Sequence, residues 1–344
     1  MSTAGRPAQS AGPRMSLAPE SLILRELIAA DAGWVSGTAL ATRLGVSRVT
    51  VWNQMERLRG QGFEFEAQSS RGYRLAKRPK MLHAGLIEAQ LEIRRKGFTL
   101  EVLDEIDSTN DEAARQLAAG RATPFAVFAR RQTQGRGRFG RSWHSEANGN
   151  LYATFAFRPR LAPERMQTFT LWMGVNVCDL VSKFVPVQPR IKWPNDIVFD
   201  GRKAGGMLTE ARVDADQIRD LVFGLGLNVN GASQDWGAEL AKRAVSLSEL
   251  GSGPIDLNRF TAALIGRVLL AYESFTEGGH AAHFADSWNR YDALRGRSVT
   301  VLEGGRRHSG AVIGVDDGGA LILRDDRGGT QRFQAGEVTI EKGG

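Results

Sequence analysis

The sequence predicts an α+β protein built from three successive parts: helices followed by a hairpin, then mixed strands and helices, and finally short strands alone. Apolar residues recur at helical spacing in the first part. Strand-like runs alternate with helical segments in the second, and glycine-rich turns separate short apolar runs in the third. We expect domains over residues 17–79, 82–291 and 292–344. Residues 1–16 are rich in Ala, Gly, Ser and Pro, which predicts a disordered tail.

The first part begins with three helical segments. Residues 21–30 repeat apolar side chains at helical spacing, and residues 38–44 form a shorter segment that Gly45 ends. Ser47 can cap a third helix over residues 48–59. The short connection containing a glycine is typical of a helix-turn-helix unit.

A hairpin follows these helices. Residues 63–65 and 73–75 are strand-like, and the polar residues 68–72 between them favour a turn. Helix, turn, helix and hairpin in this order predict a winged helix-turn-helix domain.

The third helix has a polar face that suits DNA. Val51, Met55 and Leu58 fall on its apolar side. The opposite side carries residues able to contact base edges and phosphates, namely Arg48, Thr50, Asn53, Gln54 and Arg57. Residues 1–80 contain 12 Lys and Arg against 6 Asp and Glu, so this part holds most of the chain's net charge of +7. A helical docking domain with a solvated face is the alternative, but the hairpin and the charge favour DNA.

Residues 135–143 predict a mobile loop that closes over phosphate. Three glycines and three arginines stand within residues 135–141, and arginine matches phosphate oxygens bidentately while glycine lets the backbone approach. The same residues satisfy the dinucleotide pattern G-x-G-x-x-G. However, a second strand over residues 151–157 follows in place of a helix, and no acidic residue stands at the ribose position. The dinucleotide interpretation therefore fails.

Residues 107–112, Asp-Ser-Thr-Asn-Asp-Glu, begin an Ala-rich helix that ends at Gly120. A capping box, with Thr109 as the N-cap and Glu112 three residues later, accounts for them on structural grounds alone. The positive end of the helix and its short polar side chains equally suit a polar ligand group.

Lys192 stands between an apolar residue and a turn over residues 194–196, Pro-Asn-Asp. A lysine at that place can meet a carboxylate or a phosphate as a compact point charge. The alternative is an exposed lysine at the end of a strand.

Two later strand-like segments contain paired glycines, Gly205 and Gly206 in the first, Gly224 and Gly226 in the second. Glycine inside a strand marks either the close approach of a ligand or a bulge.

Several classes of site are excluded. The five histidines are scattered, so we predict no metal site in the protein itself, and no G-x-S-x-G elbow is present. The single cysteine, Cys178, rules out an intrachain disulfide and fits a reducing, cytoplasmic environment. No apolar run approaches the roughly 18 residues of a membrane span, so we expect no membrane partner.

The last part predicts a small SH3-like β-barrel. Glycine pairs and Asp-Asp-Gly-Gly turns separate its short apolar runs. These runs cover residues 298–302, 310–315, 320–323, 330–333 and 338–340.

Taken in order, these features resemble the bifunctional biotin–protein ligases that also repress biotin operons. The resemblance covers nearly the whole chain. It rests on the helix-turn-helix, on Asp-Ser-Thr-Asn at 107–110, on Gln-Thr-Gln-Gly-Arg-Gly-Arg at 132–138, on Lys-Trp-Pro-Asn-Asp at 192–196 and on the small C-terminal domain. It implies a class II synthetase-like mixed α/β ligase domain in the middle of the chain. Phe139 departs from the family pattern, which often has a basic residue there.

The resemblance implies a two-step reaction that uses ATP and Mg²⁺. The biotin carboxylate attacks the α-phosphate to give biotinyl-5′-adenylate and pyrophosphate. A lysine amine of a biotin carboxyl carrier protein then attacks the mixed anhydride.

The resemblance also implies which residues bind each substrate. Biotin would contact Ser108, Thr109, Asn110, Gln132, Arg136, Gly137, Arg138 and Lys192. The adenylate would contact Gly135, Arg138, Trp143 and Asn228. The catalytic residues would be Lys192, Arg138 and Arg136, with Lys192 between the biotin carboxylate and the α-phosphate.

The expected partners are the carrier protein, DNA through the N-terminal domain, and a second copy of the chain in a dimer induced by the adenylate. Two other functions stay open. One is a ligand-sensing transcription factor without ligase turnover, and the other is a ligase for another carboxylic acid such as lipoate.

Overall fold

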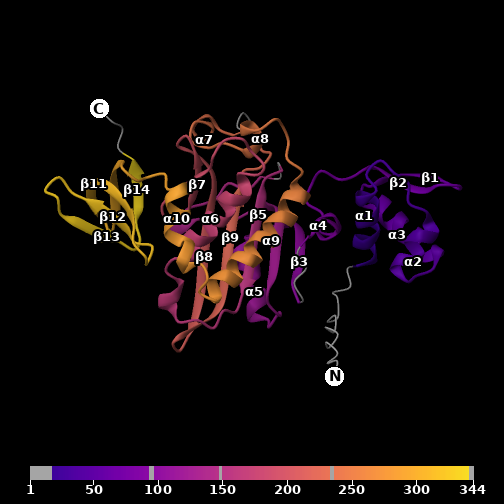
Figure 1. Cartoon of the computed structure of the whole chain (residues 1–344), viewed down its shortest axis with the longest axis horizontal. Coiled ribbons are helices and arrows are strands. Elements are labelled where there is room, and N and C mark those ends of the chain that lie inside the picture. Colours follow the sequence, from indigo (N-terminus) through magenta and orange to yellow (C-terminus); the bar gives the residue numbers. More distant parts are fainter. Residues whose placement is uncertain (1–17, 93–96, 147–148, 233–235, 341–344) are drawn as a thin grey trace, which may run out of the picture. The chain divides into compact units, whose positions relative to one another are not determined.

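A computed structural model describes most of the chain (Figure 1), and the tail expected over residues 1–16 lies outside the described part. The chain divides into two compact units. The first extends to Arg78 and includes Phe98, and the second takes Pro79–Glu92 and the chain from Thr99 onward. The described ranges are residues 18–92, 97–146, 149–232 and 236–340.

The first unit is a three-helix domain with a hairpin, as the sequence predicts. Gly45 ends the second helix with a left-handed φ of 67°, and the Ser47 hydroxyl accepts a hydrogen bond from the backbone N–H of Thr50 at 3.0 Å. A core of apolar residues from all three helices, including Leu27, Leu40 and Met55, is fully buried. The elements are α1 (Pro19–Ala29), α2 (Gly37–Leu44), α3 (Arg48–Gly60), β1 (Glu64–Gln68) and β2 (Gly72–Lys77).

The second unit is built on a mixed seven-stranded sheet with the order β3-β4-β5-β9-β8-β7-β6. Strands β3 and β4 are parallel, and helix α5 connects them, because a parallel pair needs a crossover. The other neighbouring strands are antiparallel. The strands are β3 (Thr99–Ile106), β4 (Phe125–Gln132), β5 (Leu151–Phe157), β6 (Arg190–Lys192), β7 (Asp196–Phe199), β8 (Arg202–Asp214) and β9 (Gln217–Leu227).

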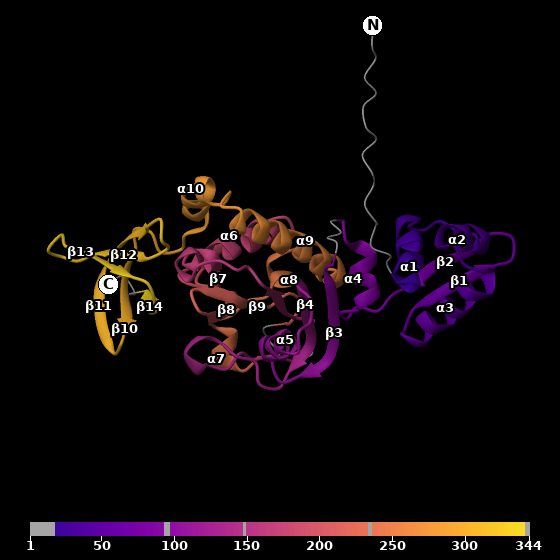
Figure 2. The same cartoon turned by 90° about the horizontal axis from the view of Figure 1, so that it is seen from below.

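Helices cover both faces of this sheet. Figure 2 shows α5 (Thr109–Ala118) on one side and α6 (Phe169–Val181) with α9 (Leu257–Thr276) on the other. Helix α6 is buried almost all round because it lies between the sheet and α9. The remaining helices are α4 (Ala84–Gln90), α7 (Ala238–Ala241), α8 (Leu247–Leu250) and α10 (Ala281–Tyr291), with 3-10 turns η1 (Arg138–Gly140) and η2 (Pro163–Met166).

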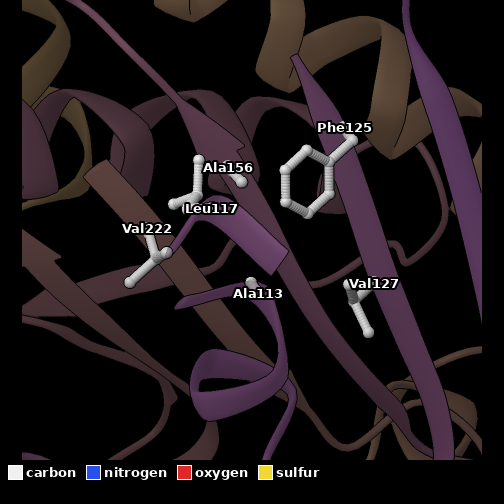
Figure 3. Close-up of a cluster of buried hydrophobic side chains, with 6 residues drawn as sticks. All are labelled: Ala113, Leu117, Phe125, Val127, Ala156 and Val222. Carbon is white, nitrogen blue, oxygen red and sulfur yellow. The ribbon is translucent and has the colours of Figure 1, made fainter. Parts of the chain in front are cut away.

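Apolar packing fixes the position of α5 on the sheet (Figure 3). Its side chains Ala113 and Leu117 are almost completely buried against the strands. Burial of a side chain such as leucine contributes about 1.5–3 kcal/mol, so this face holds the helix in place. The N-terminus of α5 is therefore fixed relative to the strands. The cluster consists of Ala113, Leu117, Phe125, Val127, Ala156 and Val222.

The C-terminal strands form a five-stranded antiparallel sheet with the order β13-β12-β11-β10-β14, in agreement with the predicted small all-β domain. Val299, Val301, Leu321 and Phe333 are its buried core. Within the described ranges, no helix is both long and apolar enough to cross a membrane. The strands are β10 (Ser298–Glu303), β11 (Arg306–Val315), β12 (Leu321–Arg324), β13 (Thr330–Phe333) and β14 (Glu337–Ile340).

Candidate active site

One cavity of about 180 Å³ gathers most of the predicted ligand-binding residues. It lies among the N-terminus of α5, the β4–β5 loop, the β6–β7 turn and strands β8 and β9, and the β13–β14 turn also contributes to its wall. Segments that are far apart in the sequence therefore meet at one place. The predicted residues that line it are Ser108, Thr109, Asn110, Gln132, Arg136, Gly137, Arg138, Trp143 and Lys192.

The α5 N-terminus presents three buried polar side chains to the cavity. Ser108 is the N-cap, with its hydroxyl accepting from the Asp111 N–H at 3.4 Å. The predicted Thr109 N-cap was wrong by one residue, because the extended backbone lies at Ser108 and Thr109 already belongs to the helix. Helix geometry thus brings Ser108, Thr109 and Asn110 to the cavity, whether or not they bind a ligand.

Thr109 and Asn110 are held by partners on several strands. The backbone N–H and the hydroxyl of Thr109 both donate to Gln132 Oε1, at 2.8 and 3.0 Å. Asn110 donates to Glu210 Oε2 at 2.8 Å and accepts from the Thr154 hydroxyl at 2.7 Å. These bonds fix both side chains and their donor and acceptor directions.

The first half of the β4–β5 loop is tightly packed. Gln132 Nε2 donates to the Ser145 hydroxyl at 2.9 Å. A Cβ at Gly135 would stand 2.6 Å from both Ser145 Oγ and the Trp143 carbonyl oxygen, so only glycine fits there. Gly135 is not among the cavity-lining residues, and its place in the structure is one of close backbone packing.

Arg136 is engaged by two carboxylates. Its guanidinium donates to Asp111 Oδ1 at 2.6 Å, and to Glu210 Oε1 and Oε2 at 3.0 and 2.9 Å. These contacts raise the pKa of Arg136 against the opposing effect of burial. The charge of Arg136 is therefore balanced by the protein itself.

Arg138 and Lys192 contrast with Arg136. Neither forms a salt bridge among the residues that the structure describes, although both line the cavity and are half-buried. Arg138 Nη1 donates only long bonds, at 3.4 Å, to Asn195 Oδ1 and to the Gly336 carbonyl oxygen. Burial lowers the pKa of both groups, and the nearby Asp196 opposes this effect. Two desolvated cations without a carboxylate partner are the arrangement expected of an anion site.

Lys192 owes its position to the β6–β7 turn. It is the last residue of β6 and lies opposite Asp196 at the start of β7 in the strand register, so Trp193, Pro194 and Asn195 form the turn. The Trp193 side chain is buried and donates to the Gly319 carbonyl oxygen at 3.0 Å. A turn is confirmed here, but it lies one residue earlier than predicted, because Asp196 already belongs to β7.

Phe139 has an unusual conformation at the edge of the cavity. Its φ of 57° lies in the left-handed region, which costs an aromatic residue energy, and its side chain is 68% exposed. The guanidinium carbon of Arg138 lies 4.7 Å from the centre of its ring. Phe139 therefore packs on the cation that its neighbour presents.

The strand glycines make room for side chains. A Cβ at Gly224 would lie 2.2 Å from Asn110 Oδ1, and one at Gly226 would lie 2.5 Å from the Trp143 ring. The pairing of β8 with β9 is regular at Gly224 and Gly226, so the bulge interpretation was wrong for these two. Beside Gly205 it is confirmed, because the pairing of β7 with β8 shifts register between Ile197–Gly205 and Val198–Lys203. The close approach is that of the protein's own Asn110 and Trp143. The buried Nε1 of Trp143 has no hydrogen-bond partner among the described residues.

Asn228 does not reach the cavity. Its side-chain amide donates to the Val245 carbonyl oxygen at 3.3 Å, and the residue is buried outside the set of lining residues. The structure therefore offers no contact that supports the predicted adenine role of Asn228.

Lys203 and Glu337 at the cavity were missed by the sequence reasoning, and Arg141 was predicted only as part of the loop that closes over phosphate. Lys203 forms a 2.7 Å ion pair with Asp196, and its ammonium lies 5.1 Å from the centre of the Trp143 ring. Arg141 pairs with Glu337, which lowers the pKa of that carboxyl group. No local motif marks Glu337, because it comes from the C-terminal sheet.

Within the described ranges, no group of three or more His, Cys, Asp or Glu side chains could hold a metal ion.

The predicted DNA-binding residues of α3 divide into two groups. Arg48, Asn53 and Arg57 are exposed. Thr50 is half-buried and its hydroxyl lies 2.9 Å from that of Ser47, while Gln54 is also half-buried. The predicted buried face of Val51, Met55 and Leu58 is confirmed.

Three family models match the chain. The HTH domain model matches residues 20–74, the biotin/lipoate A/B protein ligase family matches residues 102–228, and the biotin protein ligase C terminal domain matches residues 295–340. Together with the cavity, these matches define a ligase of the biotin/lipoate class that carries a helix-turn-helix domain.

Similar proteins narrow this class. The bifunctional ligase/repressor BirA of Bacillus spizizenii is 33% identical over 303 residues, which cover 87% of this chain and 92% of the relative. The Escherichia coli protein of the same name is 29% identical over 90% of this chain and 94% of its own length. A solved biotin protein ligase from Aquifex aeolicus, in complex with biotin and ATP, has a TM-score of 0.60 at 25% identity and covers 71% of this chain and 99% of its own. The chain belongs to the bifunctional ligase/repressor family of biotin protein ligases.

Proposed function

We propose that this protein is an ATP-dependent biotin–protein ligase that also represses transcription through its N-terminal domain. The observation that carries the ligase half is the pair Arg138 and Lys192, two half-buried cations without a carboxylate partner in the described structure, at a cavity with buried polar groups. Family membership supports the same function.

In the first step, a carboxylate oxygen of biotin attacks the α-phosphorus of ATP. The bond from that phosphorus to the bridging oxygen breaks, and pyrophosphate leaves. Lys192 and Arg138 would neutralise the charge shared by the carboxylate and the α-phosphate, and catalysis of this kind depends on positioning and electrostatics. When bound, Mg²⁺ would neutralise phosphate charge, and it would be held mainly through phosphate oxygens.

In the second step, the neutral Nζ of a lysine on the carrier protein attacks the carbonyl carbon of the mixed anhydride. The bond to the AMP oxygen breaks, AMP leaves, and the amine gives up a proton. The enzyme supplies no covalent nucleophile in this scheme. Burial raises the pKa of the Cys178 thiol far above its ordinary range, so the nucleophilic thiolate does not form there.

Ser108, Thr109, Asn110 and Gln132 would bind the ureido ring of biotin. They combine donors and acceptors in a buried place, and a ring with both N–H and C=O groups can use them. The aliphatic tail of an acid such as octanoate has no donor or acceptor that could exchange hydrogen bonds with these side chains, so the polar set supports biotin over such acids.

The sequence-based roles of three residues change in this proposal. We assign Arg136 to holding the loop, because Asp111 and Glu210 already balance its charge. Gly137 and Trp143 stay as ligand contacts, since both line the cavity, whereas Gly135 and Asn228 receive structural roles.

The ligase test uses the purified chain with biotin, Mg-ATP and an apo carrier domain, and it measures the mass of the carrier. We expect the addition of one biotin, and a much slower addition with the Lys192→Ala variant. No addition by the natural chain, with biotin still bound, would favour the ligand sensor. If the carrier gains no biotin and the chain binds none, the result would favour a ligase for another carboxylic acid.

The repressor half rests on the exposed basic residues of α3 and on the family. By analogy, biotinyl-adenylate would induce a two-fold dimer that binds a pseudo-palindromic operator in the cytoplasm. Analytical ultracentrifugation with and without the adenylate tests this step. An unchanged association state would contradict it.

A further inference from the structure

An exposed apolar pair stands out on the DNA-proposed face of α3. Val49 is 68% exposed and Trp52 is 52% exposed, and three residues apart on a helix they are neighbours. They are the only exposed large hydrophobic residues in the described part of the first unit. The apolar core of this domain lies on the opposite side of the helix, so packing inside the domain does not explain them.

The groove beside this pair is suited to a polyanion. The starts of α2 and α3 and the turn between β1 and β2 line it, and Val49 and Trp52 belong to its wall. Arg48 and Arg71 are its charged residues, and no carboxylate is among its described lining residues. Its hydroxyl and amide groups, including those of Thr38 and Gln68, can donate to phosphate oxygens.

Two of the polar residues first assigned to base reading are less free than this pair. The Thr50 hydroxyl is engaged at the N-terminus of α3 by Ser47, and Gln54 has an Oε1 atom closed off from solvent. An apolar pair at the centre of a recognition face needs an apolar group on the base edge. In the major groove that group is the C5-methyl of thymine.

We propose that Val49 and Trp52 read thymine methyl groups in the operator and so determine part of its sequence. Arg48 and Arg71 would contact the phosphates on either side of these bases. The proposal rests on the proposed DNA-binding function and adds a base preference to it.

The test starts from the full-length protein with biotin and Mg-ATP, which selects duplexes from a random-sequence library. The enriched duplex is then made with thymine or with deoxyuridine, which lacks only the methyl group. We expect the natural chain to bind the deoxyuridine duplex about fourfold more weakly for each thymine methyl group that the protein covers. Trp52→Ala and Val49→Ala should weaken binding to the thymine duplex and abolish the difference between the two duplexes.

The matched control is Val213→Ala, which removes a similarly exposed side chain from the second unit and should keep the discrimination. Ligase activity of the α3 variants should equal that of the natural chain, which shows that the second unit is intact, and an unchanged far-ultraviolet circular dichroism spectrum would show that the helices of the first unit still form. Equal binding of both duplexes by the natural chain would overturn the thymine contact and leave DNA binding intact. Failure to enrich any duplex would overturn both.

Discussion

The two halves of the β4–β5 loop use arginine for different purposes. In the first half, Arg136 is bound by Asp111 from α5 and Glu210 from β8, so its charge is neutralised within the protein. In the second half, Arg138 has no carboxylate partner among the described residues and only long bonds to neutral oxygens. Two arginines that stand two positions apart in a motif thus differ in what they can offer a ligand. The comparison teaches that the partners of a cation, more than its place in a motif, identify an anion site.

The largest expected effect tests the unpaired cations. Lys192→Ala should lower the rate of adenylate formation by about 10²–10³-fold, because a preorganised charge at the phosphate is removed. Pyrophosphate exchange with biotin and Mg-ATP measures this rate. Arg131→Ala is the matched control, since Arg131 forms an exposed pair with Glu105 on the same sheet and is not a lining residue. Equal rates of adenylate formation in Lys192→Ala and Arg131→Ala would show that Lys192 does not contribute to the reaction.

The pH dependence of the same rate sharpens this result. Lys192 acts as a cation, and burial lowers its pKa below the ordinary lysine value of 10.5, so the charge is lost as pH rises through that lowered value. Adenylate formation should therefore fall about tenfold per pH unit on an alkaline limb that begins below pH 10.5. In Lys192→Arg the limb should move to higher pH, because arginine stays charged. If the rate of adenylate formation decreases over the same alkaline pH range in Lys192→Arg, the titrating group is not Lys192.

A smaller effect is expected from the paired half of the loop. Arg136→Ala should lower adenylate formation by about threefold to tenfold, because partly exposed ion pairs contribute little each. Glu210→Gln should have a similar effect, since it weakens the same contact and the bond to Asn110. Limited proteolysis by trypsin should cut the loop faster in both variants. If Arg136→Ala lowered the rate of adenylate formation as much as Lys192→Ala, Arg136 would also act on the substrates and the two halves of the loop would not differ in function.

The smallest effect concerns the contact of the loop with the C-terminal sheet. Arg141 and Glu337 are partly exposed, so Glu337→Gln should change the Michaelis constant for ATP by about threefold or less. Arg141 lowers the pKa of Glu337, so the pair should persist below the ordinary range of glutamate and be lost only as pH falls further. Steady-state kinetics over acid pH values measure this. A change beyond tenfold would mean that this pair belongs to the substrate contacts.

Local signals made much of the fold predictable. Gly45 and Ser47 mark their helix ends through bonds that span only a few residues, and the β6–β7 turn is encoded beside Lys192. The capping prediction at Thr109 was wrong by one residue because Ser108 and Thr109 have similar capping preferences and only the backbone distinguishes them. An error of this kind displaces a helix end by only one residue, because the competing N-cap positions are adjacent in the sequence.

Long-range partners were not predictable from one sequence. Asn110 and Glu210 are 100 residues apart, and Arg141 and Glu337 are 196 residues apart. Nothing near Glu210 indicates that it accepts from both Asn110 and Arg136. Asn228 also has a long-range partner that the sequence does not indicate, since its side chain donates to the backbone at Val245.

The carbonyl group of Gly336 has a consequence for the order in which the cavity wall is assembled. It belongs to the cavity wall and accepts from Arg138, yet it is synthesised 198 residues after that arginine. A chain still attached to the ribosome can pair its central strands and pack α5 before this part of the wall has been made. The contact between Arg138 and Gly336 can therefore form only after the loop and the central strands of the cavity have been made.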